Sequence, residues 1–176
     1  LLVSSAASDV YKRQSLDRLN KLNDSTEGFD PAEVKRELQE CMQNYFGVFR
    51  RGEFMKKGLD QLNEIKEKVD NLHLKDKSDA FNTSRVEAIE LQNLFEVAEA
   101  TAVSAYVRHE SRGAHARDDF PERDDENWLC HTIFDPKNKE VSKRDVNFQP
   151  SQVEAFPPKV RTCLLYTSDA ADDTRS

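Results

Sequence analysis

The sequence predicts a mainly α fold: a three-helix bundle, preceded by a short N-terminal helix and followed by a loop-rich C-terminal segment with a small β-hairpin. Apolar side chains recur at helical spacing in three successive segments between residues 30 and 110. That periodicity stops after Glu110, where a dense run of charged residues begins. Two strand-like segments then flank a turn sequence at 135–138. These patterns place the helices first and the hairpin after them.

The two ends of the chain, residues 1–14 and 163–176, are predicted not to belong to the fold. One permitted back-translation of Ser4 to Gln14 has a reverse complement that, read one base along, encodes Cys163 to Asp172. Selection on a fold does not produce two protein ends from opposite strands of one DNA segment. The DNA also resembles a transposase adaptor used in library preparation. Such segments are set aside before a fold is predicted, so the native part is expected at residues 15–162.

A short helix is expected at Ser15 to Leu22, before the bundle. The first bundle helix should begin at Asp30-Pro31, because Asp caps free amide groups and Pro suits the first helical turn. Its apolar face comprises Val34, Leu38, Cys41, Met42, Tyr45, Phe46 and Phe49. Arg51-Gly52 separates it from the second helix, whose apolar stripe comprises Met55, Leu59, Leu62, Ile65, Val69 and Leu72. Each helix therefore has one face for a shared core.

The third helix is predicted over roughly residues 84–110, with Asn82-Thr83-Ser84 as its cap. It is apolar on more than one side, through Val86, Ile89, Leu91, Leu94, Phe95, Val97, Val103 and Val107. Small residues at 98–105 would let a neighbouring helix approach closely. A helix that is apolar all round is typically buried, and we expect this one to be.

The segment after Glu110 is predicted to be irregular, and then to form a hairpin. Residues 112–126 are mixed in charge and contain Gly113 and Pro121. Strands are expected at 128–134 and 141–148, with a turn at 135–138. Residues 155–161 should be extended because of their two prolines. The native part thus divides into a helical bundle at 15–110 and a loop, hairpin and tail at 111–162, both in one domain.

Composition excludes several classes of function. The chain carries 33 acidic and 26 basic residues, a net charge of -7, which argues against nucleic-acid binding, because that needs clustered positive charge. No apolar run approaches the roughly 20 residues of a membrane span. Outside the excluded ends the cysteines are Cys41 and Cys130, far apart in the sequence, as in a protein of a reducing compartment.

The residues at 109–131 could suggest a metal or nucleophile site, but the patterns are poor. A zinc site could use His109, His115, Cys130 and His131, yet the spacing fits no standard motif and adjacent strand residues point to opposite faces. The acidic residues lack the alternating ligands and central glycine of a calcium loop. Cys130 should be a small buried hydrophobe. A Cys/His or Ser/His nucleophile pair stays open, and the plain alternative is a surface loop whose arginines pair with its own carboxylates.

The stretch RHESRGAHARDDFPERDDENWLCHT, at residues 108–132, closely resembles the C-terminal signature of succinate dehydrogenase and fumarate reductase flavoprotein subunits. The flanks LQECMQNYFGVFR (38–50), MKKGLDQL (55–62) and FPPKVRT (156–162) agree with it. The resemblance runs from about Ser15 to Thr162. Residues 127–131 and 156–162 look more like succinate dehydrogenase than fumarate reductase.

The resemblance implies a parent enzyme that oxidises succinate to fumarate with covalently attached FAD and passes electrons through iron–sulfur centres to quinone. It implies three partners: the flavin-binding domain of the same subunit, an iron–sulfur subunit and membrane-anchor subunits. It also implies a peripheral location on the cytoplasmic face of a bacterial inner membrane, or on the matrix side in mitochondria. The family's flavin-binding and substrate-binding motifs lie upstream, and none of them occurs here. We therefore expect no catalytic residue, no metal, no FAD bound to this chain, and no activity of the chain alone.

The expected role of this chain is to pack against the flavin domain. Arginines suit domain docking because the guanidinium binds carboxylates or carbonyls in a fixed planar geometry. The expected supporting residues are Arg112, His115, Arg117 and Arg123. The resemblance adds Arg161, near the flavin domain, as a residue that supports flavin attachment. Two alternatives stay open: a fumarate reductase subunit, or a stand-alone helical interaction domain.

Overall fold

The structure is a computed structural model that describes residues 2–156. The predicted tail with Arg161 and the second excluded end lie outside the described residues. The described residues form two compact units, one of 2–44 and 58–99, the other of 45–57 and 100–156. The predicted division of the native part at Glu110 stays a prediction. No helix among the described residues is long and apolar enough to cross a membrane.

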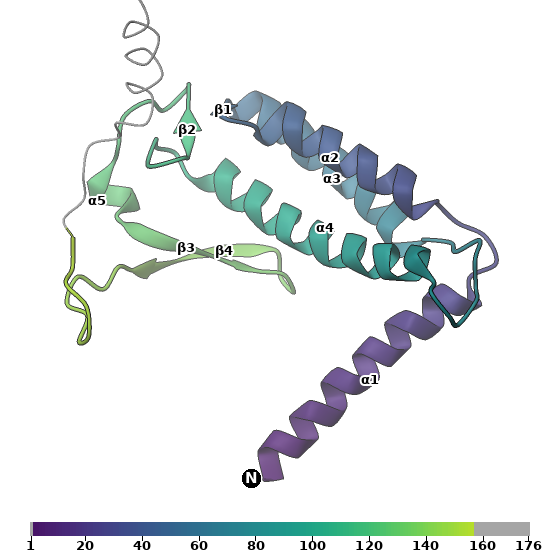
Figure 1. Cartoon of the computed structure of the whole chain (residues 1–176). Helices are drawn as coiled ribbons and strands as arrows, with labels where there is room; N and C mark the ends of the chain where they lie inside the picture. Colours follow the sequence, from purple (N-terminus) through teal and green to yellow (C-terminus); the bar gives the residue numbers. More distant parts are fainter. Residues whose placement is uncertain (1, 157–176) are drawn as a thin grey trace, which may run out of the picture. The chain divides into compact units, whose positions relative to one another are not determined.

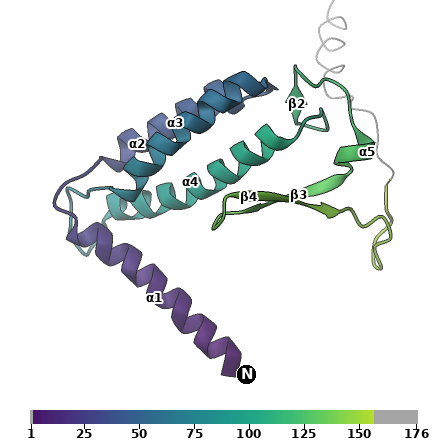
Figure 2. The ribbon, with the colours of Figure 1, turned by 180° about the vertical axis from the view of Figure 1, so that it is seen from behind.

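The predicted three-helix bundle is confirmed, and most of it belongs to the first unit. Its helices are α2 (Pro31–Phe46), α3 (Gly52–Asp70) and α4 (Thr83–Val107), which lie side by side in both views (Figures 1 and 2). Within this unit, Leu22 and Leu74 from outside the predicted stripes are buried, and the stripes supply most of the large buried apolar side chains: Val34, Leu38, Cys41, Leu62, Ile65, Val69, Leu91 and Phe95. Burial raises the pKa of the Cys41 thiol to about 11, so this cysteine is a core residue.

The N-terminal helix α1 (Leu2–Asp24) is longer than the predicted short helix. Residues 2–14 contain neither Gly nor Pro, so nothing in them stops a helix that starts further along from propagating towards the N-terminus. The C-terminal part of α1 contacts α4: the Arg18 Nε donates to Gln92 Oε1 at 3.0 Å and its Nη2 to Asn93 Oδ1 at 2.9 Å.

The connection from α1 to α2 requires a glycine. Gly28 has a φ of 146°, and a Cβ there would lie 2.3 Å from the carbonyl oxygen of Asn71. This close approach lets Phe29 N donate to Asn71 O at 2.9 Å and His73 N donate to Phe29 O at 2.9 Å. A residue with a side chain would be strained here in two ways, by its φ and by the contact.

Helix α4 begins where predicted, because Asn82 Oδ1 accepts a hydrogen bond from Arg85 N at 2.8 Å. The prediction that α4 is buried all round is wrong within this chain. Its core face is buried, but Val86, Leu94 and Val97 are 54%, 41% and 65% exposed. The bundle covers one side of the helix, and the apolar residues of its other side remain accessible.

The second unit confirms the hairpin and adds three elements that the sequence did not predict. Strands β3 (Cys130–Asp135) and β4 (Glu140–Asp145) pair antiparallel, with Cys130 opposite Asp145. Both are shorter than predicted: β3 starts after Trp128 because that residue belongs to a short helix, α5 (Asp125–Trp128), and β4 ends at Asp145, before Phe148. Strands β1 (Phe49–Arg50) and β2 (Ala116–Arg117) form a parallel pair. This pairing explains why α2 ends at Phe46 and not at Phe49.

Candidate functional site: a buried arginine–carboxylate network

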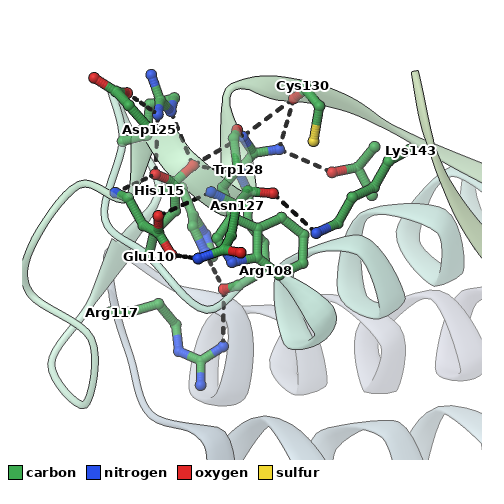
Figure 3. A network of polar contacts seen from close by, with 12 residues as sticks. Arg108, Glu110, His115, Arg117, Asp125, Asn127, Trp128, Cys130 and Lys143 are labelled. Carbon is green, nitrogen blue, oxygen red and sulfur yellow. Dashed lines mark hydrogen bonds and ion pairs between the residues drawn. The ribbon is translucent and has the colours of Figure 1, made fainter. Parts of the chain in front are cut away.

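A polar network fills the second unit where α4 ends, and it uses the segment that the sequence singled out (Figure 3). Glu110, Ser111 and Arg117 are all buried there. The plain expectation of a surface loop with self-paired arginines is therefore right about the pairing and about most of the segment, but not about Glu110 and Arg117, which are buried. Buried charges need partners, and Glu110 and Arg117 each have several.

Glu110 lies at the centre of the network and its side chain has no exposed surface. Its carboxylate accepts hydrogen bonds from Arg108 Nε at 2.8 Å, Arg112 Nε at 2.8 Å and Nη2 at 3.1 Å, and the amide of Asp124 at 2.9 Å. Burial alone would raise the pKa of this carboxyl, but the hydrogen bonds from Arg112, Asp124 and Arg108 outweigh it and lower the pKa. Glu110 is therefore held as a carboxylate.

Arg108 connects the end of α4 with the start of the hairpin. Besides Glu110, its guanidinium donates to Cys130 O at 3.1 Å, to Thr132 Oγ1 at 2.9 Å and to Trp128 O. One guanidinium thus binds a carboxylate, two carbonyls and a hydroxyl in a fixed geometry. It fixes the direction in which β3 leaves α5.

Arg117 closes the C-terminal end of α4. Its side chain is 1% exposed, and Nη1 donates to the carbonyls of Ala105 at 3.3 Å, Tyr106 at 3.0 Å and Arg108 at 3.2 Å. The last carbonyls of a helix lack partners within the helix and carry partial negative charge. A buried cation at this position satisfies both needs.

Asp119 is the carboxylate partner of Arg117 and also binds the start of α3. It accepts from Arg117 Nε and Nη2, both at 2.7 Å, and from Gly52 N at 2.9 Å. The two hydrogen bonds from Arg117 lower the pKa of Asp119 to about 2, with the Gly52 amide in support. A carboxylate at a helix N-terminus is also favoured by the helix dipole.

His115 bridges to β1. Its Nδ1 lies 2.8 Å from Arg50 Nη1, and its Nε2 lies 3.2 Å from Arg108 O. Arg50 can only donate and a carbonyl can only accept, so His115 is neutral, with its proton on Nε2. Burial lowers the pKa of His115, and the nearby charges of Arg50 and Arg117 lower it further.

Aromatic rings close the side of the network next to the hairpin. Lys143 Nζ lies 3.6 Å from the centroid of the buried Trp128 ring, within range of a cation–π contact. His109 stacks on Phe120, with 4.7 Å between ring centroids. Trp128 therefore lies between a cation of β4 and the residues that follow α4.

The structure brings together three of the five predicted supporting residues: Arg112, His115 and Arg117. Arg123 pairs at the rim with Asp125 at 2.9 Å, a carboxylate that Arg112 also binds at 2.5 Å. Arg161 lies outside the described residues. Sequence analysis missed Arg50, Arg108, Glu110 and Asp119. Glu110 and Asp119 could have been found from the sequence, because each lies two positions from an arginine. Arg50 could not, because it comes from a distant segment.

The other chemical possibilities do not assemble among the described residues. No group of three or more His, Cys, Asp or Glu side chains there could hold a metal ion. Cys130 is partly exposed and not buried as predicted. A Ser/His contact does exist, with Ser25 Oγ 3.4 Å from His73 Nδ1, but the hydroxyl donates its proton to Leu22 O at 2.8 Å. Its geometry is that of a helix end and not of an activated nucleophile.

Comparison with known proteins identifies relatives of the whole segment. A family model described as "Fumarate reductase flavoprotein C-term" matches residues 35–163. The succinate dehydrogenase flavoprotein subunit of Coxiella burnetii is 47% identical over 132 residues, which are 75% of this chain and 22% of that protein. The fumarate reductase flavoprotein subunit of Proteus vulgaris is 40% identical over 132 residues, 74% of this chain and 22% of that protein.

A solved structure agrees. A quinol fumarate reductase of E. coli matches 89% of this chain and 27% of its own, with 33% identity and a TM-score of 0.75. The chain thus spans less than a third of the length of each of these proteins.

Proposed function

Because this chain belongs to the family of fumarate reductase flavoprotein C-terminal domains, we propose that it is the C-terminal domain of a succinate dehydrogenase flavoprotein subunit. The observation that carries the proposal is the 47% identity with a succinate dehydrogenase subunit over 75% of this chain. The buried network supports it, since nearly every charged group of the signature segment is used in building the domain. We therefore assign this segment a structural role and no catalytic role.

The parent subunit would oxidise succinate to fumarate, and its FAD would accept the hydride before electrons move through iron–sulfur centres to quinone. We place this chemistry outside the chain, in the upstream flavin domain, and assign no FAD ligand to the described residues. The partners would be that domain, an iron–sulfur subunit and membrane-anchor subunits. The domain would then lie peripherally at the cytoplasmic face of a bacterial inner membrane, or on the matrix side in mitochondria.

The arginine cluster would contribute to docking by fixing the conformation of the signature segment. Arg112, His115 and Arg117 have their donors directed at groups of this unit, so their contribution is to fix the loop that a neighbouring domain meets. Arg123, at the rim, and Arg161, in the tail, would reach towards that domain. We also propose that Arg161 supports attachment of the flavin, as the family resemblance implies.

A fumarate reductase subunit is the second candidate, favoured by the 40% identity with the Proteus vulgaris protein. The two candidates share a fold, so the fold does not separate them. They differ in the direction of catalysis in the assembled complex. The ratio of succinate oxidation to fumarate reduction, measured with the native partner subunits, would distinguish them.

The proposal is tested with a hybrid subunit, in which residues 15–162 of this chain replace the corresponding part of the Coxiella burnetii subunit. We expect the hybrid to fold and to retain its flavin as fully as the parent does. A truncated parent that lacks this part is the control and should lose flavin. A hybrid that folds but retains no more flavin than the truncated control would contradict the proposal and favour a stand-alone interaction domain.

The role of the cluster is tested in the same hybrid with Arg112→Ala, which removes two donors from Glu110 and one from Asp125. Lower flavin content than in the matched exposed variant Lys137→Ala is expected. Normal flavin content and assembly in Arg112→Ala would remove that residue from the docking role.

A further inference from the structure

We infer that the exposed side of α4 between Val86 and Val97 is the surface on which this domain packs against the upstream part of its own subunit. This inference rests on the proposed function and deepens it, because it names the interface. Helix α4 carries apolar residues on more than one side. The bundle covers one side of this helix, and the apolar residues of the other side are exposed.

The exposed side carries a stripe of aliphatic side chains that is interrupted by Glu90. Val86, Leu94 and Val97 lie at helical spacing and span about 16 Å along the axis, and they are 54%, 41% and 65% exposed. Leu94 and Val97 line a shallow hollow of about 370 Å³, whose other residues are Lys35, Glu90, Leu91 and Asn93. Branched aliphatic side chains gathered around a hollow are typical of a contact surface.

The charges beside the stripe define its partner. Glu87, Glu90 and Glu96 form no ion pair within residues 2–156, and the sequence has no Lys or Arg from Val86 to Val107. A complementary surface would be aliphatic at its centre and basic at its rim. A cation already binds at one edge of this face, where the Arg18 guanidinium donates to Gln92 and Asn93 of α4.

The relatives show where such a partner would come from. The chain corresponds to only 22% of the length of the Coxiella burnetii subunit, so most of that polypeptide lies outside the matched part and is tethered to it. A second copy of this chain fits less well. In a two-fold dimer the same face meets itself, which would bring the unpaired glutamates of both copies together.

The test measures how fast a cysteine on this stripe reacts with a maleimide. Val97→Cys is placed in the chain and in the hybrid subunit, each with Cys130→Ser, and the labelled peptide is quantified by mass spectrometry. Glu64→Cys, on the exposed outer side of α3, is the matched control. We expect the Val97→Cys site to react at least about tenfold more slowly in the hybrid, because only the open fraction of an interface reacts. The Glu64→Cys site should react equally in both.

A charge reversal sharpens the test. Glu90→Lys in the hybrid should raise the labelling rate at Val97→Cys towards that of the isolated chain, whereas Glu64→Lys should leave it unchanged. Equal rates at Val97→Cys in the chain and in a flavin-loaded hybrid would overturn the inference and leave the proposed function intact. Slow labelling in the isolated chain that speeds up on dilution would assign the stripe to a second copy instead. A hybrid that holds no flavin would remove the proposed function and the inference together.

Discussion

At the scale of single residues, a carboxylate without solvent contact needs a donor for each lone-pair direction. Glu110 finds its donors in two guanidinium groups and the Asp124 amide. Arg108 in turn depends on Glu110, which is its one carboxylate partner among the described residues, and Arg112 divides its donors between Glu110 and Asp125. This mutual dependence makes Glu110 the most sensitive position of the network.

Glu110→Gln is expected to lower the free energy of unfolding by about 3–5 kcal/mol, since it leaves the largely buried Arg108 without a carboxylate and Arg112 with Asp125 alone. Glu126→Gln, an exposed neighbour in α5, is the matched control and should change it by less than about 0.5 kcal/mol. Urea unfolding followed by the fluorescence of Trp128, the only tryptophan of the chain, measures both. Equal stability of the two variants would contradict the central place of Glu110.

Asp118 and Asp119 form a matched pair of neighbours. Asp119 binds buried Arg117 and the Gly52 amide, whereas Asp118 pairs with the exposed Arg51. Asp119→Asn should cost about 1–2 kcal/mol of unfolding free energy and Asp118→Asn less than about 1 kcal/mol. The pKa of Asp119 is lowered from 3.8 to about 2, so its contribution is present above pH 3.8 and is lost as the pH falls towards 2. Urea unfolding at a series of pH values measures this loss. If the unfolding free energy of Asp119→Asn falls below pH 3.8 as much as that of the unaltered chain, this account is contradicted.

At the scale of elements, the contact between Arg50 and His115 holds β1 beside β2. These strands pair through only two residues each, so backbone hydrogen bonds alone hold them weakly. The contact requires neutral His115, which makes it sensitive to pH.

The free energy of unfolding should therefore decrease as the pH falls below the ordinary histidine pKa of 6.5. The folded pKa of His115 is lowered, so the unfolded chain binds a proton first and is favoured. His115→Gln is the matched variant, because its amide can accept from Arg50 and donate to Arg108 O without titrating. Between pH 7 and about pH 5, the free energy of unfolding should change less with pH for His115→Gln than for the unaltered chain. The same pH dependence in both proteins would exclude His115 as the cause of the loss of stability.

The helices and the hairpin could be predicted from the sequence because their signals are local. Apolar residues at helical spacing gave α2, α3 and α4, and Asn82 gave the start of α4. The pairing of β1 with β2 could not be predicted, since it joins Phe49 to Ala116 and no local pattern records it. The length of α1 was missed because residues 2–14 were excluded for the DNA that encodes them, while helix formation depends on the residues themselves, whatever their origin.

The candidate site was predictable as a segment and not as a network. Arg112, His115 and Arg117 stood out within one signature, but their partners depend on how the chain folds back. Arg50 reaches His115 from 65 residues earlier in the chain. The burial of Glu110 depends on Arg108 and Arg112 lying on either side of it, and a row of alternating charges is more often a solvated surface.

At the scale of the whole molecule, the two units carry different parts of the proposed role. The network of the second unit uses its charges internally and so sets the shape of the signature segment. The first unit leaves an aliphatic, acidic face on α4 that its own bundle does not cover. Both features are expected of a domain that completes a larger subunit, and neither is expected of a catalytic centre.

The measurement that tests this account most directly is succinate-dependent reduction of a soluble dye by the hybrid subunit, compared with the full-length Coxiella burnetii subunit and with this chain alone. The account predicts a hybrid rate within about tenfold of the full-length rate, a loss of about 1.4 kcal/mol in transition-state stabilisation, and no dye reduction by the chain alone. Succinate oxidation by the isolated 176-residue chain, or a flavin-loaded hybrid that oxidises no succinate, would contradict it.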